Sequence, residues 1–172
     1  MIEVLCPAGD LTRLKWALMY GADAVYIGGY NYSLRANANN FSMEEIKEAV
    51  KIAHELNKKV YVTVNIFAHN EDIDRLPDYL RGLQQAKVDA LLISDLGVWS
   101  TARRVVPDMP LHVSTQANTT NYATVQAWEQ LGAERVVLAR ELSLAEISEI
   151  LSLIHISEPT RLGMLSRMPS SA

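Results

Sequence analysis

The sequence repeats one short pattern, and this repeat limits the fold more than any other feature. Each copy begins where an amphipathic segment ends, turns on small or acidic residues, and continues into a short apolar run. The copies are Gly21–Ile27, Lys87–Ile93 and Gly132–Leu138. The pattern predicts the end of a helix followed by a buried strand. Strands that are apolar throughout are typical of a parallel sheet covered by helices.

Six strand–helix units can be placed along the chain. Their strands are expected at Ile2–Cys6, Ala24–Ile27, Val60–Val64, Ala90–Ile93, Leu111–Ser114 and Val136–Leu138. Ser42, with Glu45 three residues later, is typical of a capping box at a helix start. The predicted fold class is α/β, a (βα) TIM-type barrel with about six of its eight units over residues 1–150. An open doubly wound sheet is the alternative, but no glycine-rich phosphate-binding turn opens the first helix.

Composition and charge argue against several classes of protein, among them disulfide-bonded secreted proteins and membrane proteins. The formal net charge of -4 gives no electrostatic case for nucleic-acid binding by this part of the chain. The single cysteine, Cys6, excludes an internal disulfide and favours the cytoplasm. The chain has no predicted secretory signal, and no apolar run approaches the ~20 residues of a membrane span. We therefore expect a cytoplasmic protein without a membrane partner.

Polar residues that follow the predicted strands are the candidates for a site, because barrel sites lie at the carboxyl ends of the strands. Arg35 could clamp a carboxylate or phosphate, or be a solvated loop residue. Amides at these positions can orient a substrate or merely close turns, and Arg140 with Glu141 could instead form a structural ion pair. The substrate-binding candidates are Arg35, Asn65, Gln116, Asn118, Arg140 and Glu141.

The same residues predict no metal site and no catalytic group. No two histidines have the spacing of metal ligands, and no nucleophile can be assigned with its base from sequence order alone. His112 alternates with apolar neighbours in a predicted strand, so it is expected to be packed and hydrogen-bonded rather than catalytic. The catalytic residues are expected beyond residue 150.

The last part of the chain changes character at Leu151. Residues 151–161 resemble the in-frame translation of a transposase-type sequencing adapter, and Ser166–Ala172 resembles translation of the primer that follows such an adapter. Two matches in the right order predict that residues 151–172 are a non-native tail, which is left out of the fold argument. The native sequence is expected to end near Ile150.

Several motifs, in order and consistently spaced, carry a family resemblance. They are Cys6–Asp10, Gly21–Gly28, Tyr32–Arg35, Val62–Asn65, Ser114–Asn118 and Leu138–Ser143. Together they resemble the N-terminal half of the collagenase-like peptidase family, peptidase family U32, over essentially all of residues 1–150. Within that family the chain looks closest to the branch that installs 5-hydroxyuridine at the wobble position of tRNA. Other branches hydroxylate ribosomal RNA or serve anaerobic ubiquinone synthesis.

The resemblance implies a function for a longer parent protein. That parent would be an iron–sulfur-dependent tRNA uridine hydroxylation enzyme, with tRNA as its partner. Its cluster-binding cysteines would follow the next barrel strand, so this fragment would hold no cofactor; Cys6 alone cannot bind a cluster. The alternatives are a collagenase-like peptidase, a hydrolase with a peptide substrate, and a non-catalytic scaffold or assembly protein.

The fragment alone is expected to be inactive and poorly soluble. Its first and sixth strands, Ile2–Cys6 and Val136–Leu138, would be the unpaired edges of an open sheet. Both are apolar, with neither a proline nor an inward charge in the predicted range. Such edges favour association with other chains.

Overall fold

Strands and helices alternate along the chain. The structure, a computed structural model, describes residues 3–34 and 40–154. The elements are β1 (Leu5–Pro7), α1 (Leu11–Met19), β2 (Ala24–Gly28), α2 (Met43–Glu55), β3 (Lys59–Val64), α3 (Asn70–Gln85), β4 (Ala90–Ile93), α4 (Leu96–Val105), β5 (Leu111–Val113), the 3-10 turn η1 (Thr115–Ala117), α5 (Tyr122–Gln130), β6 (Arg135–Val136) and α6 (Leu144–Ile154). The predicted tail begins within α6, and residues 155–172 lie outside the described residues.

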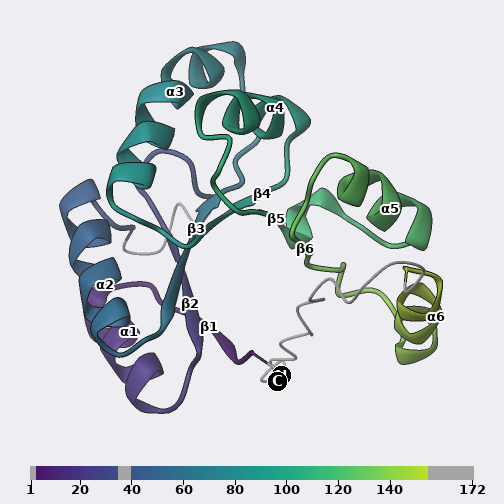
Figure 1. Ribbon diagram of the computed structural model, residues 1–172, viewed down its shortest axis with the longest axis horizontal. Coiled ribbons are helices and arrows are strands. Elements are labelled where there is room, and N and C mark those ends of the chain that lie inside the picture. The colour runs from purple at the N-terminus through teal and green to yellow at the C-terminus, as the bar shows by residue number, and fades with distance from the viewer. Residues whose placement is uncertain (1–2, 35–39, 155–172) are drawn as a thin grey trace.

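The strands form one parallel sheet in sequential order, from β1 to β6. The sheet curls, the helices lie on its outer side, and β1 and β6 are its two edges (Figure 1). The prediction of six parallel strands in barrel order is confirmed. A doubly wound sheet would reverse its strand order, so that alternative is wrong for this chain. The architecture is that of an incomplete (βα) TIM-type barrel.

Alternation along each strand divides the core into two parts. Successive strand side chains point to opposite faces. On β3, Val60, Val62 and Val64 belong to the main core between sheet and helices, whereas Tyr61 belongs to a second cluster inside the curl. The inner cluster also contains Ala24, Ala90 and Leu92. Apolar residues on both strand faces are therefore buried, as the sequence pattern predicts for a parallel sheet.

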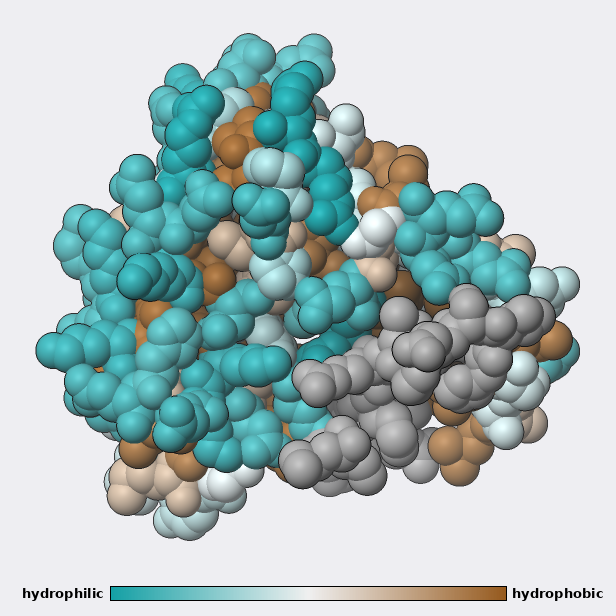
Figure 2. Space-filling view, in the orientation of Figure 1, coloured by the Kyte–Doolittle hydropathy of each residue, from teal (hydrophilic) through white to brown (hydrophobic). Residues whose placement is uncertain are grey.

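Capping side chains begin the helices where the sequence predicts them. Ser42 Oγ accepts the Glu45 backbone N–H at 3.2 Å, and the Glu45 carboxylate accepts the Ser42 N–H at 2.8 Å. Asp95 likewise accepts the Val98 N–H at 2.9 Å at the start of α4. These bonds satisfy backbone donors that have no partner within the helix. The helix surfaces that face the viewer are mainly hydrophilic (Figure 2), and no described helix is both long and apolar enough to span a membrane.

An ion pair crosses the inside of the curl near the amino ends of the strands. Arg135, on β6, donates from Nη1 to Glu3 Oε1 at 2.6 Å, and Tyr61 OH donates to the same oxygen at 2.9 Å. The Arg135 guanidinium also lies 5.5 Å from the centre of the Tyr61 ring. Because Glu3 precedes β1, this contact joins the two edges of the sheet. The Arg135 side chain is only 8% exposed, so its charge depends on this partner.

His112 packs beside this pair. Its ring meets the Tyr61 ring edge-on, with the ring centres 4.9 Å apart. Burial, together with the nearby charge of Arg135, lowers the pKa of His112 to about 3. The imidazole is therefore neutral near pH 7, consistent with the expectation of a packed histidine.

The edge strands differ from the predicted ones. β6 is Arg135–Val136 instead of Val136–Leu138, and β1 ends at Pro7; Ile2 lies outside the described residues. The expectation that both edges lack protection is wrong, because Arg135 is an inward charge on β6 and Pro7 has no N–H to offer a neighbouring strand. Both features oppose edge-to-edge association.

Removing Arg135 should destabilise the fold. In Arg135→Ala the Glu3 carboxylate stays partly buried without its cation, so the free energy of unfolding should fall by about 3 kcal/mol. Arg104→Ala, which removes an exposed arginine of α4, should change it by less than about 0.5 kcal/mol. Urea denaturation of the two variants measures the difference, and equal stabilities would show that the pair contributes nothing.

The pair should also make stability depend on pH. Burial opposes ionisation of Glu3, but hydrogen bonds from Arg135 and Tyr61 and the Arg135 charge outweigh it, so the pKa of Glu3 lies below its usual value of 4.5. A depressed carboxyl pKa contributes stability above the unfolded-state value that is lost as pH falls through the folded-state value. Glu3→Gln should remove this part of the acid sensitivity.

Candidate functional site

The loops that follow the strands all lie at one rim of the sheet, the end at which a barrel carries its site. Because the strands are parallel, the loops after β2, β3, β4, β5 and β6 leave the sheet on the same side. The loops after β5 and β6 lie beside each other, since β5 pairs with β6 through His112–Arg135 and Val113–Val136.

The loop after β5 is a tight turn held by Ser114. Ser114 Oγ accepts the Gln116 N–H at 3.4 Å, and the 3-10 turn Thr115–Ala117 follows. The turn ends at Asn118, whose φ of 51° and ψ of 47° are left-handed. Asparagine tolerates this conformation better than most residues, which explains an amide at this position. The turn thus presents Thr115, Gln116 and Asn118 along one side of the rim.

Backbone hydrogen bonds place the segment after β6 against that turn. Val137 N–H donates to the Val113 carbonyl at 2.9 Å, and Ala139 N–H donates to the Thr119 carbonyl at 3.0 Å. The next two residues, Arg140 and Glu141, form a turn of their own. They therefore stand opposite the β5 turn.

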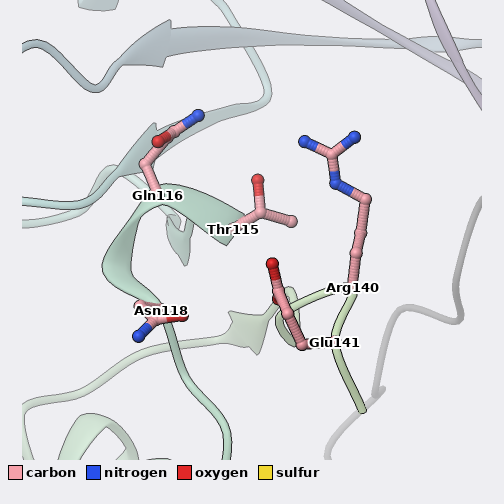
Figure 3. A pocket seen from close by; sticks show the side chains of 5 residues that line it. All are labelled: Thr115, Gln116, Asn118, Arg140 and Glu141. Carbon is pink, nitrogen blue, oxygen red and sulfur yellow. The ribbon is translucent and has the colours of Figure 1, made fainter. Parts of the chain in front are cut away.

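These two turns enclose a cavity of about 280 Å3 that is lined by Thr115, Gln116, Asn118, Arg140 and Glu141. Gln116 lies at one side of the space and Arg140 at the other, with Thr115 between them and the Glu141 carboxylate below Thr115 (Figure 3). The structure thus brings together Gln116, Asn118, Arg140 and Glu141, which sequence analysis selects as candidates. Thr115 was missed, although it directly precedes Gln116 in the same turn.

The charged and amide side chains of the cavity make no side-chain hydrogen bond or ion pair with another residue in the described part of the chain. Among the described residues no ion pair joins Arg140 to Glu141, although they are neighbours in sequence, so the structure gives no support to a structural ion pair. Nor does a described residue hydrogen-bond to the side chains of Gln116 or Asn118. Polar groups without protein partners at the mouth of a barrel are free to bind a ligand.

Asn65 lies beneath the rim instead of in the cavity. Its Oδ1 accepts the Leu34 N–H at 3.3 Å, and its Nδ2 donates to Ser114 Oγ at 3.5 Å. Its carbonyl accepts from Ser94 Oγ at 3.3 Å. Asn65 is buried and ties the ends of β2, β3, β4 and β5 together, so its contacts are those of a positioning residue.

The loop after β2 is packed closely onto its neighbours. A Cβ atom on Gly28 would collide with the Ser33 side chain, and one on Gly29 would collide with the Tyr79 hydroxyl. Tyr32 stacks on Tyr79 with ring centres 4.7 Å apart, and burial raises the pKa of both phenols. Arg35, the remaining candidate, lies outside the described residues.

The described residues do not fit an iron–sulfur cluster. No group of three or more histidine, cysteine, aspartate or glutamate side chains among them could hold a metal ion. Cys6 is half-buried and is the sole cysteine of the chain, whereas such a cluster takes about four thiolates. The cavity side chains offer hydrogen-bond donors and acceptors to a polar ligand.

The fold is that of a (βα) barrel protein with a polar cavity at the carboxyl ends of its strands. The family profile of peptidase family U32 matches residues 9–160, and the chain belongs to that family. The solved structure of the U32 peptidase Mk0906 has the same fold, with a TM-score of 0.72 at 16% sequence identity, covering 91% of this chain and 66% of that one.

Two of the curated relatives that the chain matches have names that refer to RNA. The chain is 51% identical over 148 residues to tRNA hydroxylation protein P1 of Bacillus subtilis, covering 86% of this chain and 35% of that protein. It is 36% identical over 149 residues to the 23S rRNA 5-hydroxycytidine C2501 synthase of Escherichia coli, covering 87% of this chain and 22% of that protein. The chain therefore spans about a third or less of the length of these two relatives.

Two amide variants should separate positioning from binding. Asn65→Ala leaves the Leu34 N–H without its acceptor and should lower the free energy of unfolding by about 1–2 kcal/mol. Gln116→Ala removes an exposed side chain with no described partner and should leave stability within about 0.5 kcal/mol of the parent. Thermal or urea unfolding of both variants measures this. Equal losses in the two variants would contradict the division.

Proposed function

We propose that this chain forms the substrate-orienting part of a tRNA hydroxylation enzyme that acts on uridine. The observation that carries the proposal is the rim cavity: its charged and amide side chains, which have no side-chain partner among the described residues, lie where barrel enzymes bind their substrates. The 51% identity to a tRNA hydroxylation protein supports RNA as the ligand. The substrate tRNA also argues for a cytoplasmic protein.

In this proposal the chain binds a base rather than the RNA backbone. A net charge of -4 offers little attraction to phosphates, which proteins usually neutralise with lysine and arginine. The cavity instead offers a guanidinium, a carboxylate, two amides and a hydroxyl, which suit the hydrogen-bonding edge of one base. Orienting that base is the contribution that these residues can make to its modification.

The oxidising group is proposed to lie elsewhere in a longer protein. Hydroxylation of a uracil ring replaces C–H by C–OH, a two-electron oxidation that needs an oxygen donor and an electron acceptor. The resemblance within family U32 favours an iron–sulfur cluster for that protein. Its thiolates would come from residues other than those described.

Arg140 provides the test. The complete reading frame that carries residues 1–150 is expressed in bacteria whose own tRNA hydroxylation proteins are deleted, and tRNA nucleosides are measured by mass spectrometry. The parent should restore hydroxylated uridine, and Arg140→Ala should lower it at least about tenfold, the effect of losing one charge-assisted hydrogen bond. Arg104→Ala is the matched control and should act like the parent.

The melting temperature of each variant is measured alongside. It should change little in Arg140→Ala, because no described residue bonds this guanidinium. Unmodified tRNA with the parent protein would overturn the proposal, and cleavage of a peptide substrate by the same protein would favour the peptidase alternative.

A further inference from the structure

Three large apolar side chains are exposed together at the C-terminal end of helix α1. Trp16, Met19 and Tyr20 are 53%, 73% and 83% exposed. Their spacing of i, i+3 and i+4 places them on one face of the helix. Leu14 and Leu18 are buried on the other side of α1, in the core between helices and sheet. The three exposed residues therefore form an apolar surface, the α1 surface, that is turned away from the sheet.

The two aromatic rings of the α1 surface are stacked on each other. The ring centres of Trp16 and Tyr20 are 5.7 Å apart, and the ring planes meet at 22°. Each ring restrains the other, so less side-chain freedom is lost when a partner covers them. Tryptophan, tyrosine and methionine are also enriched where polypeptides contact each other. The α1 surface thus has the composition of a protein contact.

The neighbouring helix α2 has an outer face of the ordinary polar kind. It lies beside α1 on the same side of the sheet (Figure 1). Its exposed positions carry ionisable side chains throughout: Glu44, Lys47, Glu48, Lys51, His54 and Glu55. A helix face that stays in water is normally polar. The apolar side chains of α1 therefore set it apart from an equivalent helix of the same sheet.

The α1 surface lies where a closed barrel would release its chain. β1 is an edge of the described sheet, and in a complete barrel the last strand pairs with the first, so the last helix lies beside α1. Each helix runs back along its strand and ends near the amino ends of the strands, where Met19 and Tyr20 also lie. A region that follows the last helix would therefore start close to the α1 surface.

The length of a relative leaves room for such a region. The 148 residues that match tRNA hydroxylation protein P1 are 35% of that protein, which makes it about 420 residues long. A barrel typically takes about 250 residues, so roughly 170 residues exceed that size.

The area of the α1 surface favours this region over a second copy of the chain. Each partner of a stable complex buries about 800 Å2, more than three side chains of this size can expose. A covalently linked region can dock on a smaller area because its effective concentration is high.

We propose that the α1 surface is the docking site for the region that follows the barrel in the complete protein. Apolar side chains of that region would cover the Trp16–Tyr20 stack and Met19. The proposal concerns how two parts of one polypeptide pack, so it holds or fails whatever the substrate is.

The test places a photoreactive side chain on the α1 surface. The protein encoded by the complete reading frame that carries residues 1–150 is purified with Trp16→p-benzoylphenylalanine and irradiated. The photoreactive group should link to a peptide that lies more than about 250 residues from the N-terminus, past the barrel, within a single copy of the protein. Lys51→p-benzoylphenylalanine, on the polar face of α2, is the matched control and should give no such link.

Proteolysis gives a second readout. Trp16→Glu puts a charge on the α1 surface and should raise the rate at which proteinase K cleaves the region after the barrel at least about tenfold, the effect of losing one aromatic anchor. Lys51→Glu should be cleaved like the parent. A link from position 16 between two copies, a link only within the barrel, no link at all, or a cleavage rate unchanged by Trp16→Glu would overturn the proposal.

Discussion

Every strand of this sheet has to bury both of its faces, and the remaining features of the molecule follow from that requirement. Helices cover the outer face, but none of the described helices covers the inner one. Curling the sheet buries its inner face because the inner side chains then pack against each other, as Tyr61 does with Ala24, Ala90 and Leu92. Curling also collects the carboxyl ends of the strands on one rim, which brings the turns after β5 and β6 together.

The charged side chains at the two ends of the curled sheet differ in whether they have a partner. Near the amino ends of the strands, the Arg135 guanidinium pairs with the Glu3 carboxylate and lies over the Tyr61 ring. The neutral His112 packs beside them. Breaking such a buried pair leaves a charge without a partner, which makes the pair a constraint on structure. At the rim, Arg140 and Glu141 have no partner among the described residues, so a ligand that meets them breaks no ion pair between those residues. The two arginines of this βα unit thus differ: Arg135 is held by the ion pair, whereas Arg140 lines the rim cavity.

Local signals in the sequence predict most of the fold. The apolar runs at Ala24–Ile27 and Ala90–Ile93 are buried strands, and the Ser42–Glu45 pair begins a helix, because burial and capping depend on near neighbours. β6 was placed one residue late because a strand of two residues that begins with arginine has no apolar signal. The partner of that arginine, Glu3, is 132 residues away, a separation that periodicity cannot bridge.

The candidate site was predictable to a similar degree. Position after a strand suffices to select Gln116, Asn118, Arg140 and Glu141, since parallel strands end together. It does not show which way a side chain turns. Asn65 occupies an equivalent position after β3, but bonds to Leu34 and Ser114 draw it beneath the rim.

In the proposed function, the rim cavity receives the RNA base. A tRNA with 4-thiouridine at the modified position, irradiated with the full-length protein, would form a covalent link to whatever side chain lies against that base. Mass spectrometry of the linked peptide should identify residues of the turns 115–118 or 140–141. A link to the opposite end of the barrel, near Lys59 or Arg135, or to the outer helices would contradict the account.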